Sequence, residues 1–209
     1  MTTPPYRIES ERLVIRCWEP RDAAALKEAV DSSLDHLRPW MPWAANEPQT
    51  LDEKVDLLRS FRGQFDLDQN AVYGVFERDE SRVLGGSGLH PVPGDDAARE
   101  IGYWIREDAI GKGYATELTA VLTRVAFEHF GVERVDIRVE PSNVRSQSVP
   151  RKLGYVEEAT LRRRLPPKSD DGPLRDVVIF TMVAEELPAS PCVRYDYVAY
   201  DAAGRPVEG

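Results

Sequence analysis

Two glycines before a helix-like segment, Gly111 and Gly113, are the residues whose spacing points most directly to chemistry. They follow a strand-like run that ends at Arg106, and they precede a helix-like stretch. Glycine lets the backbone bend tightly and bring its N–H groups close to an anion, with the positive end of the helix dipole behind them. This junction predicts a phosphate-binding turn, although a Gly-x-Gly between a strand and a helix is by itself more often a plain turn.

The spacing excludes two common nucleotide-binding turns. A P-loop needs Gly-x-x-x-x-Gly-Lys followed by Ser or Thr, but Lys112 is followed by Gly113. A dinucleotide-binding fingerprint needs Gly-x-Gly-x-x-Gly, and Thr116 stands at the last of these positions. The ligand of the turn must therefore be inferred from the surrounding residues.

The segments around the turn alternate between strand-like and helix-like patterns. We expect strands at 12–18, 71–77, 82–90, 99–106, 134–140, 155–165 and 177–183. We expect helices at 21–30, at 51–65, from the glycine turn to near Gly131, and at 146–153. Residues 37–43 (LRPWMPW) are expected to form an aromatic, proline-rich loop, and a turn around Asp170 joins the last two strands. This order predicts an α/β (α+β) domain.

The end of the chain differs in character from the rest. We expect one domain over residues 1–187 and a tail over residues 188–209, in which prolines accompany an alternating VRYDYVAY. Such a tail is expected to be an added strand or arm. It would form either an edge strand of the same sheet or an arm that packs on a second subunit of a homodimer.

Length, charge and composition limit the classes of function. The chain has 209 residues, of which 42% are hydrophobic and 30% charged, as is usual for a soluble single domain. The formal charge of -9 disfavours nucleic acid or an anionic membrane as partner. Cys17 and Cys192 lack metal-binding spacing, so no metal site is expected. Without a signal-like or membrane-spanning apolar run, we expect a cytoplasmic protein.

The stretch EIGYWIREDAIGKGYATEL (100–118) resembles the acetyl-CoA-binding motif of the GNAT N-acetyltransferase superfamily, whose pattern is Gln/Arg-x-x-Gly-x-Gly/Ala. Asp108 stands at its first position, where the family has Gln or Arg. A second block, NVRS (143–146) followed by KLGY (152–155), resembles the later Asn-x-x-Ser motif. SERLVIR (10–16), HLRPWMPW (36–43) and EIGYW (100–104) are similar to the ribosomal-protein alanine N-acetyltransferase branch. The similarity covers roughly residues 10–186.

The resemblance implies a fold and a cofactor site. The GNAT fold has a mixed, mostly antiparallel sheet of about seven strands that splays between strands 4 and 5, with about four flanking helices. Acetyl-CoA would be the co-substrate, with its pantetheine arm along the backbone near Trp104, Ile105 and Arg106 and its pyrophosphate in the glycine turn. The residues expected to form that turn are Gly111, Lys112, Gly113, Tyr114, Ala115 and Thr116. Asn143 would bond the pantetheine amide, or only shape the turn before its helix.

The reaction requires an acid and a base. The resemblance assigns protonation of the leaving thiolate to Ser146, whose alternative role is to cap a free N–H at the helix start. Glu100 is the candidate base, directly or through water, and its alternative is a strand carboxylate satisfied by a neighbour. An α-amino group with a pKa of ~7.7–8 is partly neutral at physiological pH, whereas a lysine costs about 3.4 kcal/mol more to deprotonate. Deprotonation of an N-terminal amine therefore requires less help from the enzyme than deprotonation of a lysine side chain.

Acceptor recognition is expected from the first helical region. Arg38, Trp40 and Trp43 lie where this branch forms its acceptor cleft, although aromatics in such loops are often core plugs. His90 could reach the site from the end of its strand, although a lone histidine is more often structural. The arginine run 162–164 is expected to be a solvated face.

Three functions stay open at this point. The first is acetylation of the N-terminus of a protein or peptide. The second is the same chemistry on a small amine, such as an antibiotic, a polyamine or an amino-acid conjugate. The third is a binding module that holds acyl-CoA without turnover, which the retention of Glu100, Asn143 and Ser146 disfavours.

Overall fold

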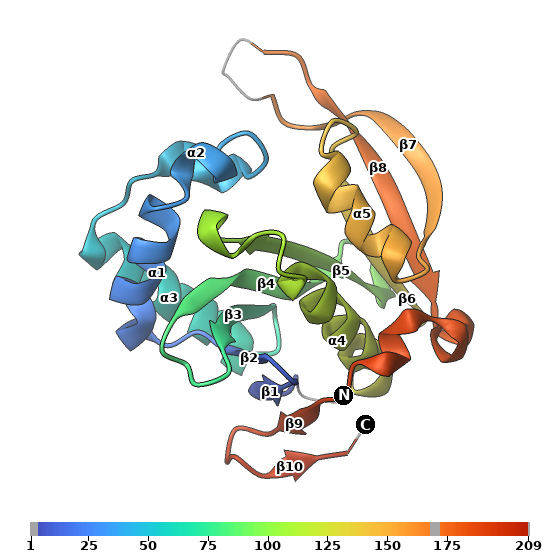
Figure 1. The fold of residues 1–209 in the computed structure, drawn as a ribbon, viewed down its shortest axis with the longest axis horizontal. Helices are drawn as coiled ribbons and strands as arrows, with labels where there is room; N and C mark the ends of the chain where they lie inside the picture. Colours follow the sequence, from blue (N-terminus) through green and yellow to red (C-terminus); the bar gives the residue numbers. More distant parts are fainter. Residues whose placement is uncertain (1–3, 168–171, 209) are drawn as a thin grey trace.

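The computed structural model describes residues 4–167 and 172–208, which contain one large sheet flanked by helices (Figure 1). The strands are β1 (Arg7–Glu9), β2 (Leu13–Cys17), β3 (Ala71–Glu77), β4 (Val83–Val92), β5 (Asp95–Ile105), β6 (Arg134–Val139), β7 (Val156–Leu165), β8 (Arg175–Val183), β9 (Val198–Tyr200) and β10 (Pro206–Val207). The α-helices are α1 (Ala23–Asp31), α2 (Leu34–Leu37), α3 (Leu51–Asp66), α4 (Tyr114–Glu128) and α5 (Val144–Lys152). The expected turn around Asp170 lies outside the described residues.

The sheet has ten strands in the order β10-β9-β1-β2-β3-β4-β5-β6-β8-β7. The seven expected strands correspond to β2–β8, and β9 and β10 lie in the tail that was expected to add a strand or an arm. The sequence patterns missed β1, because a three-residue strand carries almost no alternation. All strand pairs are antiparallel except β5 with β6. The expected class, mixed and mostly antiparallel with flanking helices, is confirmed.

The sheet opens between β5 and β6. These two strands are in register only where residues 98–100 face residues 134–136, and beyond Glu100 strand β5 pairs with β4 alone. The fourth and fifth of the expected strands therefore splay apart, as the resemblance implied. In residues 4–167 and 172–208, no strand pairs with the backbone groups on the β6 side of residues 101–105.

Helices cover both faces of the sheet. On one face, α1 and α3 pack on β3 and β4 around a core that includes Trp18, Leu58 and Phe76. On the other face, α4 packs on β5, β2 and β6, and its buried Leu118 and Val121 belong to the larger core. The splayed end of β5 lies between these two layers.

Local signals explain where two of the helices begin. Thr50 Oγ1 accepts from the N–H of Glu53 at 3.3 Å, and the N–H of Thr50 donates to Glu53 Oε2 at 2.7 Å, so the expected capping box starts α3. The prediction of an irregular proline-rich loop over residues 37–43 is wrong in part. Residues 34–37 form α2, and residues 42–46 form a 3-10 helix. The helix expected from Ser146 begins two residues earlier, where Asn143 is the N-cap.

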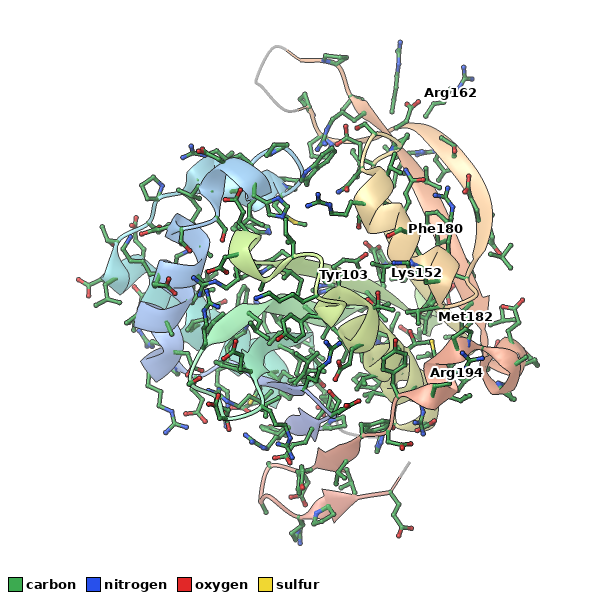
Figure 2. The ribbon with its side chains drawn as sticks, viewed as in Figure 1. Tyr103, Lys152, Arg162, Phe180, Met182 and Arg194 are labelled. Atoms are coloured by element: carbon green, nitrogen blue, oxygen red, sulfur yellow. The ribbon has the colours of Figure 1, made fainter. Side chains whose placement is uncertain are left out.

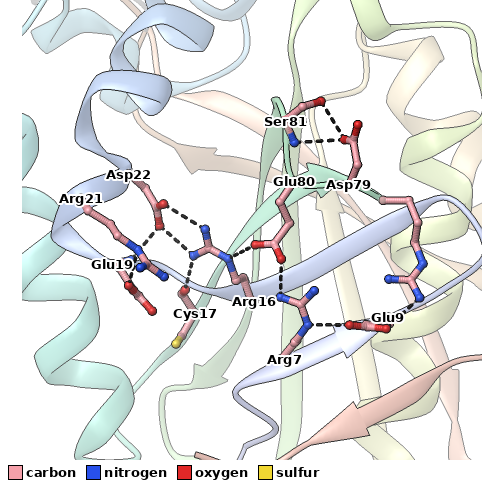
Figure 3. Close-up of polar contacts among 11 residues, drawn as sticks. Arg7, Glu9, Arg16, Cys17, Glu19, Arg21, Asp22, Asp79, Glu80 and Ser81 are labelled. Carbon is pink, nitrogen blue, oxygen red and sulfur yellow. Dashed lines mark hydrogen bonds and ion pairs between the residues drawn. The ribbon is translucent and has the colours of Figure 1, made fainter. Parts of the chain in front are cut away.

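A network of ion pairs fixes the first strands to the β3–β4 turn (Figure 3). Arg16 of β2 donates to Glu80 at 2.6 Å and to both carboxylate oxygens of Asp22, and Glu80 also accepts from Arg7 of β1. The Arg16–Asp22 pair is largely buried, with side chains 12% and 10% exposed. This network ties the start of α1 to the sheet.

The end of the chain adds to the same sheet. β9 pairs with β1 in antiparallel register, and β10 pairs with β9 (Figure 1). Cys192, in the tail before β9, is fully buried in the main core. Within one chain, the tail therefore forms edge strands of the sheet and completes part of its core.

The described residues contain neither a membrane-spanning helix nor a cluster of metal ligands. No helix in residues 4–167 or 172–208 is long and apolar enough to cross a membrane. Over the same residues, no group of three or more His, Cys, Asp or Glu side chains is arranged to hold a metal ion.

Candidate active site

The glycine turn joins β5 to α4 with a backbone that favours glycine. Gly111 and Gly113 have φ angles of 78° and 84°, in the left-handed region, and Gly113 is the N-cap of α4. An added Cβ at Gly111 would have nothing within 4 Å, so conformation and not space selects glycine there. In the described part of the chain, no protein acceptor was found for the N–H groups of residues 111–115. These groups form the open N-terminal end of a helix, which attracts an anion.

A buried carboxylate in the first turn of α4 anchors this junction. Glu117 is 2% exposed and accepts hydrogen bonds from Ser10 Oγ at 2.8 Å and from the N–H and Nε of Arg12 at 3.0 and 2.7 Å. Arg12 Nη1 also donates to the carbonyl of Lys112 at 2.9 Å, and its guanidinium lies over the Tyr114 ring. The segment before β2 therefore holds the glycine turn in place. Sequence patterns missed this contact because it joins residues more than 100 positions apart.

Asp108, which stands where the GNAT pattern has Gln or Arg, is paired with two arginines. Its carboxylate accepts from Arg106 Nε at 2.8 Å and from Arg82. Burial raises the pKa of Asp108, but the hydrogen bonds and positive charges of Arg82 and Arg106 together lower it below its usual value. The negative charge is thus balanced away from the N–H groups of the turn.

A pocket of about 750 Å³ extends from the glycine turn between α4 and α5, and we call it the α4/α5 pocket. The expected site residues that line it are Trp40, Trp104, Ile105, Gly111, Gly113, Tyr114, Ala115, Thr116, Asn143 and Ser146. Arg145 and Lys152 of α5 also line it, and Figure 2 labels Tyr103 and Lys152 in this central region. The pocket has an open strand edge on one wall and a helix N-terminus at its end.

Hydrogen bonds at the end of β5 show which backbone groups face the pocket. The N–H of Arg106 donates to the carbonyl of Leu84 in β4 at 2.9 Å. Because N–H directions alternate along a strand, the N–H groups of Tyr103 and Ile105 point to the opposite edge, where β6 has splayed away. These two residues are the ones free to pair with an extended ligand.

The two hydroxyls of Tyr103 and Ser146 meet at the wall of this pocket. Tyr103 Oη lies 3.0 Å from Ser146 Oγ and donates to the Ser146 carbonyl at 3.1 Å. The N–H of Ser146 donates to Asn143 Oδ1 at 3.1 Å, so Asn143 caps α5 and the Ser146 hydroxyl is not the cap. Burial raises the pKa of Tyr103 to about 12, which keeps its hydroxyl protonated.

A second pocket, of about 510 Å³, lies on the opposite face of β5, and we call it the α1/α3 pocket. Trp43 and His90 line it, as do Trp18 and Phe61. Its two charged side chains in the described structure, Lys54 and Glu47, form a buried ion pair with each other. Met41, Tyr103 and Trp104 line both pockets, so the two pockets meet at the end of β5.

Comparisons with known proteins agree with this geometry. The GNAT acetyltransferase domain matches residues 12–156, which is more than half of the chain. The chain belongs to the GNAT acetyltransferase family. [Ribosomal protein uS5]-alanine N-acetyltransferase of Escherichia coli (strain K12) is 26% identical over 188 residues, 88% of this chain and 93% of that protein. YdaF of Bacillus subtilis (strain 168), a candidate ribosomal N-acetyltransferase, is 29% identical over 177 residues, 85% of this chain and 94% of that protein.

A similar protein of known structure contains a form of CoA. RimJ of Mycobacterium smegmatis in complex with CoA-disulfide has a TM-score of 0.77 and 25% identity, and covers 91% of this chain and 93% of its own. The protein is thus an acetyl-CoA-dependent acyltransferase of the GNAT family, and the resemblance seen in the sequence is confirmed. The α4/α5 pocket fits this co-substrate, since it joins an open strand edge for an amide-bearing arm to free N–H groups for phosphate.

Four residues expected at the GNAT site lie outside both pockets: Arg38, Glu100, Arg106 and Lys112. Arg106 directs its N–H to Leu84 and its guanidinium to Glu28 and Asp108, so its backbone N–H is not available to pantetheine. Lys112 lines neither pocket, and its carbonyl accepts from Arg12. Arg38 donates to the carbonyl of Glu47 at 3.2 Å, which fixes the loop instead of lining a cleft.

Glu100 lies on the α1/α3 face of β5, opposite His90 in register, but it lines neither pocket. Its Oε2 is 3.2 Å from Arg138 Nε of β6. Burial raises the pKa of Glu100, Arg138 lowers it, and Asp136 raises it further. The carboxylate is therefore held at the splay by a neighbouring strand, which matches the alternative role considered for it.

No pattern in the sequence singles out Tyr103, Arg12 or Glu117 as site residues. Tyr103 stands in EIGYW, and a position in a strand does not reveal that its hydroxyl meets a helix 43 residues away. The arginine run 162–164 is exposed on β7, where Arg162 points outward (Figure 2).

Proposed function

We propose that this GNAT enzyme transfers the acetyl group of acetyl-CoA to the α-amino terminus of a protein or peptide. The observation that carries the proposal is the meeting of the two pockets at Met41, Tyr103 and Trp104. A thioester in the α4/α5 pocket and an amine entering from the α1/α3 pocket would come together at the end of β5. Each pocket thus serves one substrate.

The open edge of β5 serves to hold and polarise the thioester. The pantetheine arm pairs with the backbone of Tyr103 and Ile105 as an added strand would, and the phosphates bind the N–H groups of residues 111–115. A backbone N–H at the splay also stabilises the oxyanion that forms on the acetyl oxygen. Oxyanion stabilisation by fixed N–H groups is typically a large contribution to acyl transfer.

Ser146 is the group we assign to the leaving thiolate. Its hydroxyl lines the α4/α5 pocket and lies 3.0 Å from the protonated Tyr103 hydroxyl. Asn143 fixes the first turn of α5 and so the position of Ser146. When the carbon–sulfur bond breaks, Ser146 donates its proton to sulfur and can recover one from Tyr103.

The acceptor pocket favours a neutral amine with an apolar neighbour. Aromatic side chains form much of its wall, and the ring centroids of Trp43 and Trp104 are 5.8 Å apart. Its charged side chains, Glu47 and Lys54, are paired with each other. An α-amino group loses its proton far more readily than a lysine side chain. The Escherichia coli relative, by its name an N-acetyltransferase of an alanine in ribosomal protein uS5, supports a protein as the acceptor.

A substrate panel tests the proposal. Purified enzyme and acetyl-CoA would be mixed with short peptides that begin with Ala, Ser or Met, with the same peptides blocked at the N-terminus, and with polyamines, and thiol release would be followed. We expect turnover of the peptides with a free N-terminus. Turnover of polyamines alone would replace the peptide acceptor by a small amine.

A further inference from the structure

We propose that His90 is the general base that takes the proton from the attacking amine, an inference that rests on the acetyl transfer proposed above. His90 is on β4 and lines the acceptor side, the α1/α3 pocket. Glu100 does not line that pocket, and its carboxylate is bound by Arg138. The base is therefore best sought among the groups that the pocket exposes to the amine.

Among the residues that the structure describes, His90 has a hydrogen-bond partner at one ring nitrogen and none at the other. His90 Nδ1 lies 2.9 Å from Asn70 Oδ1, while Asn70 Nδ2 donates toward Gln64 Oε1 at 3.5 Å. Because the amide oxygen of Asn70 only accepts, Nδ1 carries the proton in this arrangement. Nε2 then holds the lone pair that a base needs.

Two glycines leave room beside this nitrogen. Gly88 of β4 and Gly102 of β5 face each other in register on the same side of the sheet as His90. A Cβ on Gly88 would lie 2.7 Å from His90 Nε2, and one on Gly102 would lie 3.6 Å from it. The imidazole can occupy this place only because Gly88 has no side chain. Gly102 is followed by Tyr103, where the two pockets meet.

The charges around His90 keep it neutral. Burial lowers the pKa of His90, so the imidazole is unprotonated at neutral pH. From α3 and the residues after it, the groups at this side are the uncharged Gln64 and Asn70 and the Lys54–Glu47 pair. From β5 the charged group at this side is Glu100, which is opposite His90 but paired with Arg138. The carboxylates near the imidazole, Glu47 and Glu100, are each paired with a cation, so neither is free to stabilise a protonated His90.

The proton transfer balances within the proposed reaction. The amine nitrogen forms a bond to the acetyl carbon, and the proton that this nitrogen loses goes to His90 Nε2. The carbon–sulfur bond breaks, and the thiolate receives its proton from Ser146. His90 then gives its proton to solvent, and the Ser146–Tyr103 pair takes one proton back from solvent, so that both groups return to their starting protonation states.

Kinetics with matched histidine variants test the inference. For an alanine-starting peptide, His90→Gln should lower kcat/KM by about 100-fold or more while acetyl-CoA affinity stays unchanged, since general bases typically contribute at least that much. His129→Gln is the control, because His129 is also buried with a pKa lowered by burial, but it lines neither pocket. Melting temperatures of both variants would show that folding is retained.

A second variant and a direct measurement keep the test decisive. Asn70→Asp places a carboxylate on Nδ1, which should raise the pKa of His90 and move the acid limb of kcat/KM to higher pH. Nitrogen NMR of labelled histidine in the wild-type enzyme with CoA should show the Nδ1–H tautomer and a pKa below 6.5.

Each outcome decides the matter. Peptide turnover within twofold of wild type in His90→Gln, an Nε2–H tautomer, or an acid limb that Asn70→Asp leaves in place would overturn the role of His90 alone. Failure of the wild-type enzyme to acetylate any peptide would instead reject the proposed function, and with it the inference.

Discussion

The Tyr103–Ser146 hydroxyl pair lies at the point where the two pockets meet, and it gives the first test at the scale of single residues. Tyr103→Phe removes one hydroxyl and keeps the ring. We expect kcat to fall about tenfold, as one hydrogen bond to the reacting acid is worth about 1.4 kcal/mol, with little change in KM for acetyl-CoA. Steady-state kinetics of thiol release would measure both constants.

Tyr155→Phe provides the control, because Tyr155 is also buried and bonded to a hydroxyl, that of Thr123 at 2.5 Å, but lines neither pocket. Combining Tyr103→Phe with Ser146→Ala should cost no more than Ser146→Ala alone, since Tyr103 acts through Ser146. Additive losses would show that the tyrosine acts independently.

A substitution of Gly111 tests whether the glycine turn binds the phosphates of CoA. Gly111→Val places a β-branched residue at a φ of 78°, which strains the turn by about 1–2 kcal/mol. We expect CoA affinity to weaken about tenfold, measured by calorimetry. Gly63→Val is the matched control, because an added Cβ at Gly63 also meets nothing within 4 Å, but Gly63 is in the last turn of α3, away from the glycine turn. Equal affinity in both variants would remove the turn from the site.

At the scale of elements, α5 carries Ser146 and depends on the Asn143 cap. Asn143→Ala should destabilise the protein by about 1 kcal/mol and also reduce kcat, because the first turn of α5 loosens around Ser146. Thr50→Ala removes the cap of α3 at a similar cost, yet α3 carries no group assigned to the chemistry. Chemical denaturation and kinetics of the two variants separate the effects: a kcat loss shared by both would point to general instability.

The elements also show how far the sequence could lead. The glycine turn, the helix after it and the splayed strand were predictable, since each depends on local spacing and on a family motif within about 20 residues. The Arg12–Glu117 anchor, the Tyr103–Ser146 pair and the position of Glu100 were not. Each depends on which strands become neighbours and which face of them is buried, and that is decided by packing across the whole sheet.

At the scale of the whole molecule, the tail is part of the domain's core. Cys192 is fully buried, Ser190 Oγ donates to the Leu153 carbonyl at 2.6 Å, and Arg124 donates to the Tyr195 carbonyl at 2.9 Å. Ending the chain after Leu187 removes these contacts, at a cost of about 2 kcal/mol or more, so we expect the melting temperature to fall by at least about 4 °C.

Ending the chain after Tyr200 is the comparison for this truncation. It deletes β10 and keeps Cys192 and β9, so its melting temperature should stay close to that of the full chain. Calorimetry of the three proteins would measure the difference. If the protein that ends at Leu187 were as stable as the full chain, the tail would be an arm and not a part of the core.

Mass spectrometry of one acceptor peptide tests the central claim most directly. The peptide would begin with a free alanine and carry one internal lysine, and fragment ions would locate the acetyl group after incubation with enzyme and acetyl-CoA. We predict acetylation of the α-amine, lost when the N-terminus is blocked. Acetyl groups only on the lysine, or an unmodified peptide beside acetylated small amines, would contradict N-terminal acetylation by this enzyme.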